Sequence, residues 1–326
     1  MGRTFVVTGA AGFIGSHLVE RLLRDGHRVV GLDSFDTFYD PALKEANVAR
    51  ALAHPGFRLV RGDIRDEHAV AAAFGGGEVD TVVHLAARAG VRPSIKDPVL
   101  YSSVNVDGTT RLLEAARGHG TRRFVLASSS SVYGNNVKVP FAEDDPVEHP
   151  ISPYAATKRS CELVAHTYHH LFGMDVACLR LFTVFGPRQR PDLAIRKFAT
   201  LMAEGREIEQ YGDGSSARDY TYVDDIVEGI VRSADRIEGF RIWNLGGSHP
   251  VSLTELVARI AAGLGVEPRV KRLPPQPGDV DRTWADVTRA NRELGWSAQV
   301  GLEEGLARFA RWFEDERSPT SRKATS

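Results

Sequence analysis

A glycine-rich turn lies near the start of the chain, between a short apolar run and a helical pattern. The stretch VVTGAAGFIG places Gly9, Gly12 and Gly15 directly after the apolar run. Glycine suits these positions because a side chain would keep the backbone away from a pyrophosphate, while the following helix N-terminus offers N–H donors and the positive end of its dipole. A glycine-rich turn alone is weak evidence, but its strand–turn–helix context predicts a dinucleotide-binding βαβ unit.

Short β-branched runs alternate with helical patterns through the first half of the chain. The runs are FVVTG, RVVGLD, FRLVRGD, DTVVHLA, RFVLASS and DVACLRLF, and FIGSHLVERLLRDG and NVDGTTRLLEAARGHG are examples of the helical patterns between them. Strands separated by helices imply βαβ crossovers and a parallel sheet buried on both faces. We therefore predict an α/β fold with a doubly wound parallel (Rossmann) sheet and a smaller mixed α/β C-terminal substrate domain.

The composition of the sequence changes after residue 182. Prolines and glycines are frequent in VFGPRQRPD and LPPQPGD, and SLTE at 252–255 has the pattern of a capping box. We expect an NAD-binding Rossmann domain over residues 1–182, joined by 215–245, and a substrate domain over 183–214 and 246–315. The polar residues 316–326 are expected to form a disordered tail.

Composition narrows the class of protein. Of the 326 residues, 41 are basic and 42 acidic, which argues against nucleic acid or an anionic membrane as the main partner. The two cysteines, Cys161 and Cys178, lie in apolar segments, as expected of core thiols in a reducing compartment. With no secretory signal pattern and no apolar run of membrane-spanning length, we expect a cytoplasmic protein.

Two acidic residues follow later strands. Asp33 ends the second strand in VVGLDS, where a carboxylate accepts hydrogen bonds from ribose hydroxyls and repels a 2′-phosphate, so NAD is favoured over NADP. The alternative for this residue is a turn-forming aspartate. Asp63 ends the third strand and, with Ile64, could flank the adenine, although alone it fits a loop cap equally well.

A tyrosine and a lysine stand one helical turn apart in SPYAATK. Ser152 can cap this helix and Pro153 suits its first position, so Tyr154 and Lys158 share one face. An ammonium beside a phenol favours the phenolate, which can take a proton from a sugar hydroxyl while a nicotinamide takes the hydride. The alternative is an exposed Tyr/Lys pair on a surface helix, which is common.

Several motifs together resemble those of the extended short-chain dehydrogenase/reductases, in the nucleotide-sugar epimerase and dehydratase group. They are TGAAGFIG, HLAA, SSSSVYG, PYAATK, the GP after the sixth strand, ARDYTYVDD and PGD, and the likeness runs from Thr4 to about Phe313. The resemblance implies a bound NAD that is reduced and re-oxidised within one turnover, with Ser129, Tyr154 and Lys158 as catalytic residues. The expected cofactor-binding residues are Gly9, Gly12, Phe13, Ile14, Gly15, Asp33, Asp63, Ile64, Leu85, Ala86, Ala87, Asn105, Ser128, Tyr154 and Lys158.

The serines of SSSSVYG bear on the reaction type. In the 4,6-dehydratases of this family, the two positions before Val-Tyr-Gly are Asp and Glu. In its nucleotide-sugar decarboxylases, the position just before Val is typically Glu. This chain has Ser130 and Ser131 there, so dehydration lacks its acid and base. The resemblance therefore implies epimerisation, with Ser129 sharing the sugar proton with Tyr154 and Tyr133 belonging to the turn.

The segment LRLFTVFGPRQRPDLA bears on the sugar. Similar UDP-glucose 4-epimerases usually have Asn in place of Thr183, whereas Thr183 followed by GPRxRPD resembles the UDP-glucuronate 4-epimerases. A guanidinium can hold a hexuronate carboxylate in two parallel hydrogen bonds, and Arg190 is the candidate, with Thr183 and Ser130 or Ser131 as hydroxyl donors. The alternative is that Arg188 and Arg190 decorate an exposed turn.

The expected nucleotide end of the substrate site lies later in the chain. Arg218 and Tyr220 match family positions near the diphosphate and ribose, and Asp279 matches a ribose-contacting acid. Gln276 stands where many UDP-glucose epimerases carry Arg, which puts one phosphate contact in doubt. Arg282 could replace that contact.

One further pattern has a weaker functional interpretation. His166, His169 and His170 have a spacing that can bind zinc on a helix, but no fourth ligand is evident, so no metal is expected. The family resemblance instead implies a homodimer formed through residues 101–118 and 152–172.

Taken with these patterns, the resemblance implies an isomerase of carbohydrate metabolism, which would convert UDP-glucuronate to UDP-galacturonate at C4 through a transient 4-keto sugar. Within enzymes, the alternatives are a UDP-glucose 4-epimerase and a UDP-glucuronate decarboxylase. The alternative from another class is an NAD-binding regulator that keeps the same fold.

Overall fold

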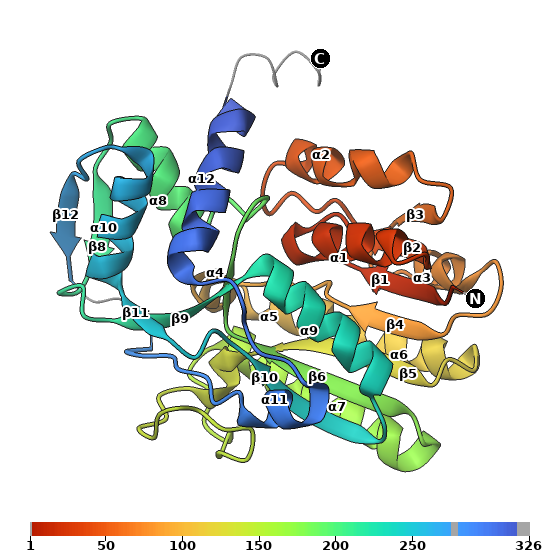
Figure 1. The fold of residues 1–326 in the computed structure, drawn as a ribbon. Coiled ribbons are helices and arrows are strands. Elements are labelled where there is room, and N and C mark those ends of the chain that lie inside the picture. The colour runs from red at the N-terminus through yellow and green to blue at the C-terminus, as the bar shows by residue number, and fades with distance from the viewer. Residues whose placement is uncertain (1, 275–279, 318–326) are drawn as a thin grey trace.

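The computed structural model describes residues 2–274 and 280–317. Its centre is a seven-stranded parallel sheet with the strand order β10-β6-β5-β4-β1-β2-β3 (Figure 1). The strands are β1 (Thr4–Thr8), β2 (Arg28–Asp33), β3 (Phe57–Arg61), β4 (Thr81–His84), β5 (Arg123–Ser129), β6 (Asp175–Leu181) and β10 (Phe240–Leu245). All six predicted strands of the first half are present, and the doubly wound α/β fold is confirmed.

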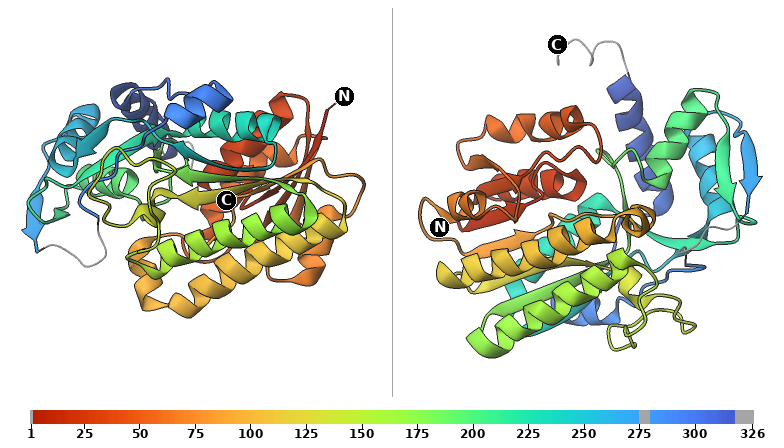
Figure 2. Two further views of the ribbon diagram at one scale, coloured as in Figure 1. Left: turned by 90° about the horizontal axis from the view of Figure 1, so that it is seen from below. Right: turned by 180° about the vertical axis from the view of Figure 1, so that it is seen from behind.

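Helices cover both faces of this sheet, as Figure 2 shows from two further sides. One layer consists of α1 (Phe13–Arg24), α2 (Pro41–Leu52) and α9 (Val223–Arg236), and the other of α3 (Glu67–Phe74), α6 (Gly108–Gly118) and α7 (Pro153–Phe172). Each layer buries its own apolar cluster against the sheet. The strands therefore have buried residues on both faces, which explains their nearly continuous apolar runs.

A smaller mixed α/β group of elements lies beside the large sheet, at the left of Figure 1. Its first sheet has the order β11-β9-β7, and β8 and β12 form a parallel pair. The elements are β7 (Thr183–Phe185), α8 (Ala194–Ala203), β8 (Ile208–Tyr211), β9 (Ala217–Tyr222), β11 (Pro250–Ser252), α10 (Leu253–Leu264), β12 (Val270–Leu273) and α12 (Leu302–Arg317). Shorter helices are α4 (Val91–Lys96), α5 (Pro98–Ser102) and α11 (Thr288–Leu294), with a π-helical turn at Ser103–Asp107 and a 3₁₀ turn at Ser130–Tyr133.

The sheet topology supports a division of the chain near the predicted boundaries. β10 belongs to the large sheet and α9 packs beside it, whereas β9 pairs with β7 and β11 of the small sheet. We therefore propose that the chain returns to the first domain at α9 rather than at residue 215. At the C-terminal end, α12 continues to Arg317, and Glu316 accepts hydrogen bonds from Arg196, so these two residues of the expected tail are helical. Residues 318–326 lie outside the described part.

Two helix starts follow the sequence prediction. Ser152 accepts a hydrogen bond from the Ala155 backbone N–H at the start of α7, and Ser252 does the same for Glu255 at the start of α10. These contacts satisfy backbone donors that have no partner inside the helix. The Ser152 cap matters for the site, because α7 carries Tyr154 and Lys158.

Two other sequence features have a clear place in the fold. Cys161 and Cys178 are buried free thiols, as the apolar patterns predict. Among the helices of the described ranges, none is both long and apolar enough to cross a membrane.

Candidate active site

A cavity of about 500 Å³ opens at the carboxyl ends of the parallel strands. Residues that follow β1 to β6 in turn line it, which is where ligands bind in open parallel α/β sheets. Every expected cofactor-binding residue except Asn105 lies on its wall, as do Ser129, Ser130, Ser131, Thr183 and Arg190. The fold therefore brings the two predicted groups of residues, for the cofactor and for the sugar, into one space.

The glycine turn lines one end of this cavity and has no room for side chains. Gly9 has a φ of +69°, and a Cβ there would lie 2.8 Å from the Ala86 nitrogen. A Cβ on Gly15 would lie 2.0 Å from the Gly9 oxygen. Gly12 immediately precedes α1, so the N-terminus of this helix faces the cavity. The geometry fits a pyrophosphate that approaches bare backbone.

Asp33 is buried beside this turn at the end of β2. Its carboxylate accepts hydrogen bonds from the Ala11 and Phe35 backbone N–H groups, at 3.0 and 2.8 Å. Burial raises the pKa of Asp33, against the opposing effects of these bonds and of the Lys44 ammonium, which lies 4.0 Å away. Lys44 also lines the cavity, from α2, and was not predicted because nothing in its local sequence marks it.

The three residues expected to be catalytic meet on the cavity wall. Lys158 is buried and donates from Nζ to the Ala127 carbonyl oxygen at 2.7 Å, which ties α7 to the end of β5. Ser129 Oγ donates to Ser131 Oγ at 3.0 Å and accepts from the Ser131 backbone N–H. Tyr154 lies one turn before Lys158, with its ring edge-on to Tyr101. The arrangement places a phenol, an ammonium and a hydroxyl around one volume.

A buried ion pair stands directly behind this wall. Arg180 of β6 donates from Nε and Nη2 to the two carboxylate oxygens of Glu162 in α7, at 2.9 and 3.0 Å. The same carboxylate accepts hydrogen bonds from Ser128 and Arg159, at 2.6 and 3.0 Å. Burial opposes ionisation of Glu162, but the hydrogen bonds and charge of Arg180 outweigh it, so the pKa of Glu162 lies below its ordinary value.

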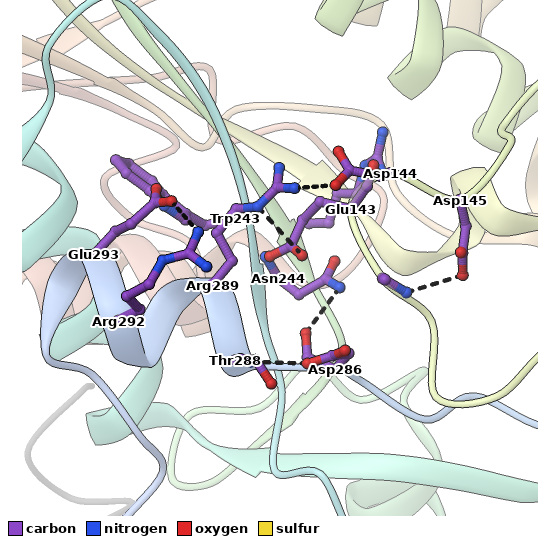
Figure 3. A network of polar contacts seen from close by, with 12 residues as sticks. Glu143, Asp144, Asp145, Trp243, Asn244, Asp286, Thr288, Arg289, Arg292 and Glu293 are labelled. Atoms are coloured by element: carbon purple, nitrogen blue, oxygen red, sulfur yellow. Dashed lines mark hydrogen bonds and ion pairs between the residues drawn. The ribbon is translucent and has the colours of Figure 1, made fainter.

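The contacts of Arg180 continue into the turn after the serines. Its Nη1 donates to the Tyr133 hydroxyl and to the Glu143 carbonyl oxygen, and Tyr133 donates to Asn244 Oδ1 at 2.6 Å. The Asn244 backbone N–H in turn donates to the Glu143 carboxylate, and Figure 3 shows this pair beside Asp286. Tyr133 thus belongs to the turn, as predicted, and burial raises its pKa.

No carboxylate of the described cavity wall stands beside Ser130 and Ser131. The acidic lining residues in the described part are Asp33, Asp36 and Asp63, which follow β2 and β3. β2 lies three strands from β5, which carries the serines. An acid and base for water elimination are therefore missing from this part of the described wall.

Arg190 reaches the same cavity from the loop after β7. Its Nε and Nη2 donate to the Asp192 carboxylate at 2.9 and 2.7 Å, and its guanidinium lies over the Phe38 ring. The side chain is 18% exposed, so it does not decorate an open turn. Arg188, two residues earlier, points elsewhere and pairs with Glu20 of α1.

Asn105 lies behind the cavity wall rather than in it. Its side chain accepts a hydrogen bond from the Arg88 N–H at 2.8 Å and donates to the Arg88 carbonyl oxygen and to Thr157 Oγ1. We interpret Asn105 as holding the HLAA segment against α7. Arg88 itself lines the cavity and pairs with Asp36. It was not predicted as a site residue, although it directly follows HLAA.

The expected nucleotide end is only partly described. Arg218 donates to the backbone oxygens of Ala217 and Asp281, and Tyr220 packs edge-on to Phe185. These two residues and Arg282 are not on the wall of the 500 Å³ cavity. Gln276 and Asp279 lie outside the described residues. Their roles at the nucleotide end remain predictions.

The three histidines of α7 have structural contacts. His169 Nδ1 hydrogen-bonds the Met174 carbonyl oxygen at 2.8 Å, and the rings of His166 and His170 stack on one another. His166 also meets the Phe240 ring edge-on. Within residues 2–274 and 280–317, no group of three or more possible ligand side chains is placed to hold a metal ion.

The sheet, the glycine turn and the position of the cavity are typical of dinucleotide-binding α/β proteins. A sequence model described as GDP-mannose 4,6 dehydratase matches residues 6–309, and the chain belongs to this family of extended short-chain dehydrogenase/reductases. The match covers both groups of elements. It therefore extends beyond the dinucleotide-binding half.

Three relatives show the range of reactions on this fold. The UDP-glucuronate 4-epimerase of Thermodesulfobacterium geofontis is 40% identical over 312 residues, which cover 95% of this chain and 96% of that protein. The crystal structure of the UDP-glucuronic acid 4-epimerase from Bacillus cereus, with UDP-glucuronic acid and NAD, aligns with a TM-score of 0.90 at 36% identity, covering 96% and 99% of the two chains. A double mutant of DesIV, a dTDP-glucose 4,6-dehydratase from Streptomyces venezuelae, aligns with the same TM-score at 35% identity, covering 96% and 97%. Backbone shape therefore does not separate epimerase from dehydratase.

We predict that Gly15→Ala weakens the dinucleotide site. The new Cβ would overlap the Gly9 oxygen, so the turn must open, and we expect at least a roughly tenfold loss of NAD affinity. The matched control is Gly263→Ala in α10, where a Cβ meets nothing within 4 Å, and which should be neutral or stabilising by about 0.5–1 kcal/mol. NAD titration and thermal melting measure both, and unchanged NAD affinity in Gly15→Ala would contradict the interpretation.

A second prediction concerns the buried ion pair. Glu162→Gln leaves the Arg180 charge buried without its partner, so we expect a loss of about 3 kcal/mol in the free energy of unfolding at pH 7. Because the folded-state pKa of Glu162 is depressed, its contribution is present above the ordinary value of 4.5 and is lost as the pH falls. The difference in the free energy of unfolding between wild type and variant, measured by urea unfolding, should therefore become smaller as the pH is lowered. A gap that widens instead would contradict this prediction.

Proposed function

We propose that the protein is an NAD-dependent 4-epimerase of UDP-glucuronate, which forms UDP-galacturonate. The relatives named UDP-glucuronate 4-epimerase support this, as does the structure of one of them with UDP-glucuronic acid and NAD. The observation that carries the proposal is local to this chain. Serines stand where a dehydratase needs acids, and a guanidinium lies on the same cavity wall.

The residues present fit NAD. The glycine turn leaves no room for a Cβ, and Asp33 is buried at the end of β2, where a carboxylate can accept from the adenosine ribose hydroxyls. The same cavity is lined by Tyr154. NAD supplies a hydride acceptor that can return the hydride to the same carbon. Gly9 to Gly15 would hold its pyrophosphate, and Lys158 would contact its nicotinamide ribose.

The protein's own groups supply the proton chemistry. Tyr154 takes the proton of the sugar 4-hydroxyl, assisted by Ser129, and later returns a proton to the carbonyl oxygen of the 4-keto sugar, whose opposite face then meets the cofactor. Lys158, whose Nζ donates to the Ala127 carbonyl oxygen, lies one helical turn after Tyr154 on the same cavity wall and would assist the phenol. The sugar must turn about its diphosphate linkage between the two transfers, so the pocket must hold UDP firmly and the ring loosely.

The carboxylate is the one part of the sugar that needs a firm contact. Oxidation at C4 produces a β-keto acid, which loses CO₂ when the bond to the carboxylate aligns with the carbonyl π system. Arg190 and Thr183 line the cavity and can hold the carboxylate out of that alignment. Asp192 accepts from Arg190 Nε and Nη2, so the contact with a substrate carboxylate would come from Nη1 and the second Nη2 hydrogen.

We further propose a homodimer that forms through residues 101–118 and 152–172. Large apolar side chains on or near these helices are exposed, which supports a covered face: they are Val99, Leu163, Leu171 and Phe172. A cytoplasmic location, a role in carbohydrate metabolism, and the absence of nucleic acid or membrane partners remain predictions of the sequence.

The direct test is to incubate the purified protein with UDP-glucuronate, without added NAD, and to follow the sugar by proton NMR. We expect UDP-galacturonate with its carboxylate retained, formed by a resident and recycled cofactor. A pentose product would mean decarboxylation and would overturn the interpretation of the serines. Turnover of UDP-glucose alone would favour a UDP-glucose 4-epimerase, and no turnover of either would favour the NAD-binding regulator.

A separate prediction tests the carboxylate contact. Arg190→Ala and Thr183→Ala should weaken binding of UDP-glucuronate and raise the share of decarboxylated product, because the carboxylate can then rotate into alignment. We expect about a tenfold rise in KM for Arg190→Ala, the size of one charge-assisted contact. NMR quantification of pentose and hexuronate products measures the effect. Unchanged binding together with no added decarboxylation would exclude this role.

A further inference from the structure

The loop that carries Arg190 is tied to the helix that opens the dinucleotide site. Arg188 donates from Nη2 to both carboxylate oxygens of Glu20 in α1, at 2.9 and 2.8 Å. His17, one turn earlier on α1, hydrogen-bonds through Nε2 to the Pro187 carbonyl oxygen at 2.9 Å. α1 begins at Phe13, directly after the glycine turn, so one helix contacts both the predicted cofactor site and this loop.

The loop alternates in direction along three consecutive residues. Arg188 points to α1, and Gln189 is buried, donating to the Val184 carbonyl oxygen and accepting from the Arg196 N–H. Arg190 points into the cavity. The position of Arg190 therefore depends on the two contacts immediately before it in the chain.

The backbone at Arg188 has a conformation that a side chain makes unfavourable. Its φ is +63°, in the left-handed region that residues other than glycine adopt rarely. Its Nη1 is also buried without a hydrogen-bond acceptor among the residues described. Features that cost stability need a compensating contact, and the structure provides one in the ion pair between Arg188 Nη2 and the Glu20 carboxylate.

We propose that Arg188 is a positioning residue which, through its ion pair with Glu20, sets the selectivity for an acidic sugar. This inference rests on the proposed function. When the pair is intact, the turn holds the Arg190 guanidinium at the cavity wall in reach of a substrate carboxylate. When the pair is broken, the turn relaxes and Arg190 loses its fixed place. Binding of a sugar that makes no contact with Arg190, such as a neutral sugar, is unaffected.

The test compares Glu20→Gln and Arg188→Gln with the wild type. We expect KM for UDP-glucuronate to rise about three- to fivefold, the range of a partly exposed ion pair, while kcat changes less than about twofold. The inhibition constant of UDP-glucose, measured as a competitor, should stay unchanged. Arg188→Lys keeps the charge and should recover part of the loss in KM.

A double-mutant cycle asks whether the effect passes through Arg190. In an Arg190→Ala background, Glu20→Gln should have no further effect on KM for UDP-glucuronate. The matched control is Arg21→Gln, which breaks a similarly exposed ion pair between α1 and Glu228 of α9, with an N–O distance of 2.7 Å. This variant should leave KM for UDP-glucuronate and the inhibition constant of UDP-glucose at their wild-type values.

Three results would overturn the inference. They are an equal loss for UDP-glucuronate and UDP-glucose, full additivity of Glu20→Gln with Arg190→Ala, and variants that behave like Arg21→Gln. All three results presuppose that the wild-type protein epimerises UDP-glucuronate. A wild type that fails to do so would instead overturn the proposed function, so the two failures are distinguishable.

Discussion

The ion pair between Glu162 and Arg180 joins the three elements on which the site is built. Glu162 lies on the helix that carries Tyr154 and Lys158, Arg180 lies on β6, and Ser128 of β5 binds the same carboxylate. Such a pair is a weak source of stability, because both charges must leave water. The pair matters more for the relative positions of these elements, since two strands and a helix cannot slide past one another without separating buried charges. Lys158, bonded to the neighbouring Ala127, adds a second tie between α7 and β5.

The predicted site is built from two halves on opposite sides of the sheet's centre. The glycine turn and Asp33 follow β1 and β2, whereas the serines and Thr183 come from β5 and the segment after β6. Parallel strands bring all these ends to one edge, and Asn105 holds the HLAA segment between the two halves. A hydride and a proton must leave the sugar from a single bound position. The rigid link from β5 to α7 keeps the proton acceptor in place for that event.

Most of the fold could be predicted from local sequence patterns. The strands of the first half, the two serine caps and the glycine turn each depend on neighbouring residues, so the sequence pattern predicts them directly. The Glu20–Arg188 pair escaped prediction because it joins residues far apart in the chain, and Lys44 because its place beside Asp33 depends on how α2 packs after β2. Asn105 was assigned to the cavity wall by resemblance, and the structure places it one layer behind. The nucleotide end depends partly on residues 275–279, which are outside the described ranges.

The family includes proteins that dehydrate and proteins that epimerise on one backbone, so the reaction must be decided by a few side chains. Here the described wall carries serine hydroxyls and Tyr154, with no carboxylate among the lining residues that follow β5, which fits a reversible hydride transfer at C4 without water elimination. The most direct measurement is turnover of UDP-glucuronate that carries deuterium at C4, in ordinary water, with the product analysed by NMR and mass spectrometry. The account predicts that the deuterium stays at C4 of UDP-galacturonate. Loss of the label to solvent would contradict it, because C4 would then exchange a proton rather than return the same hydride.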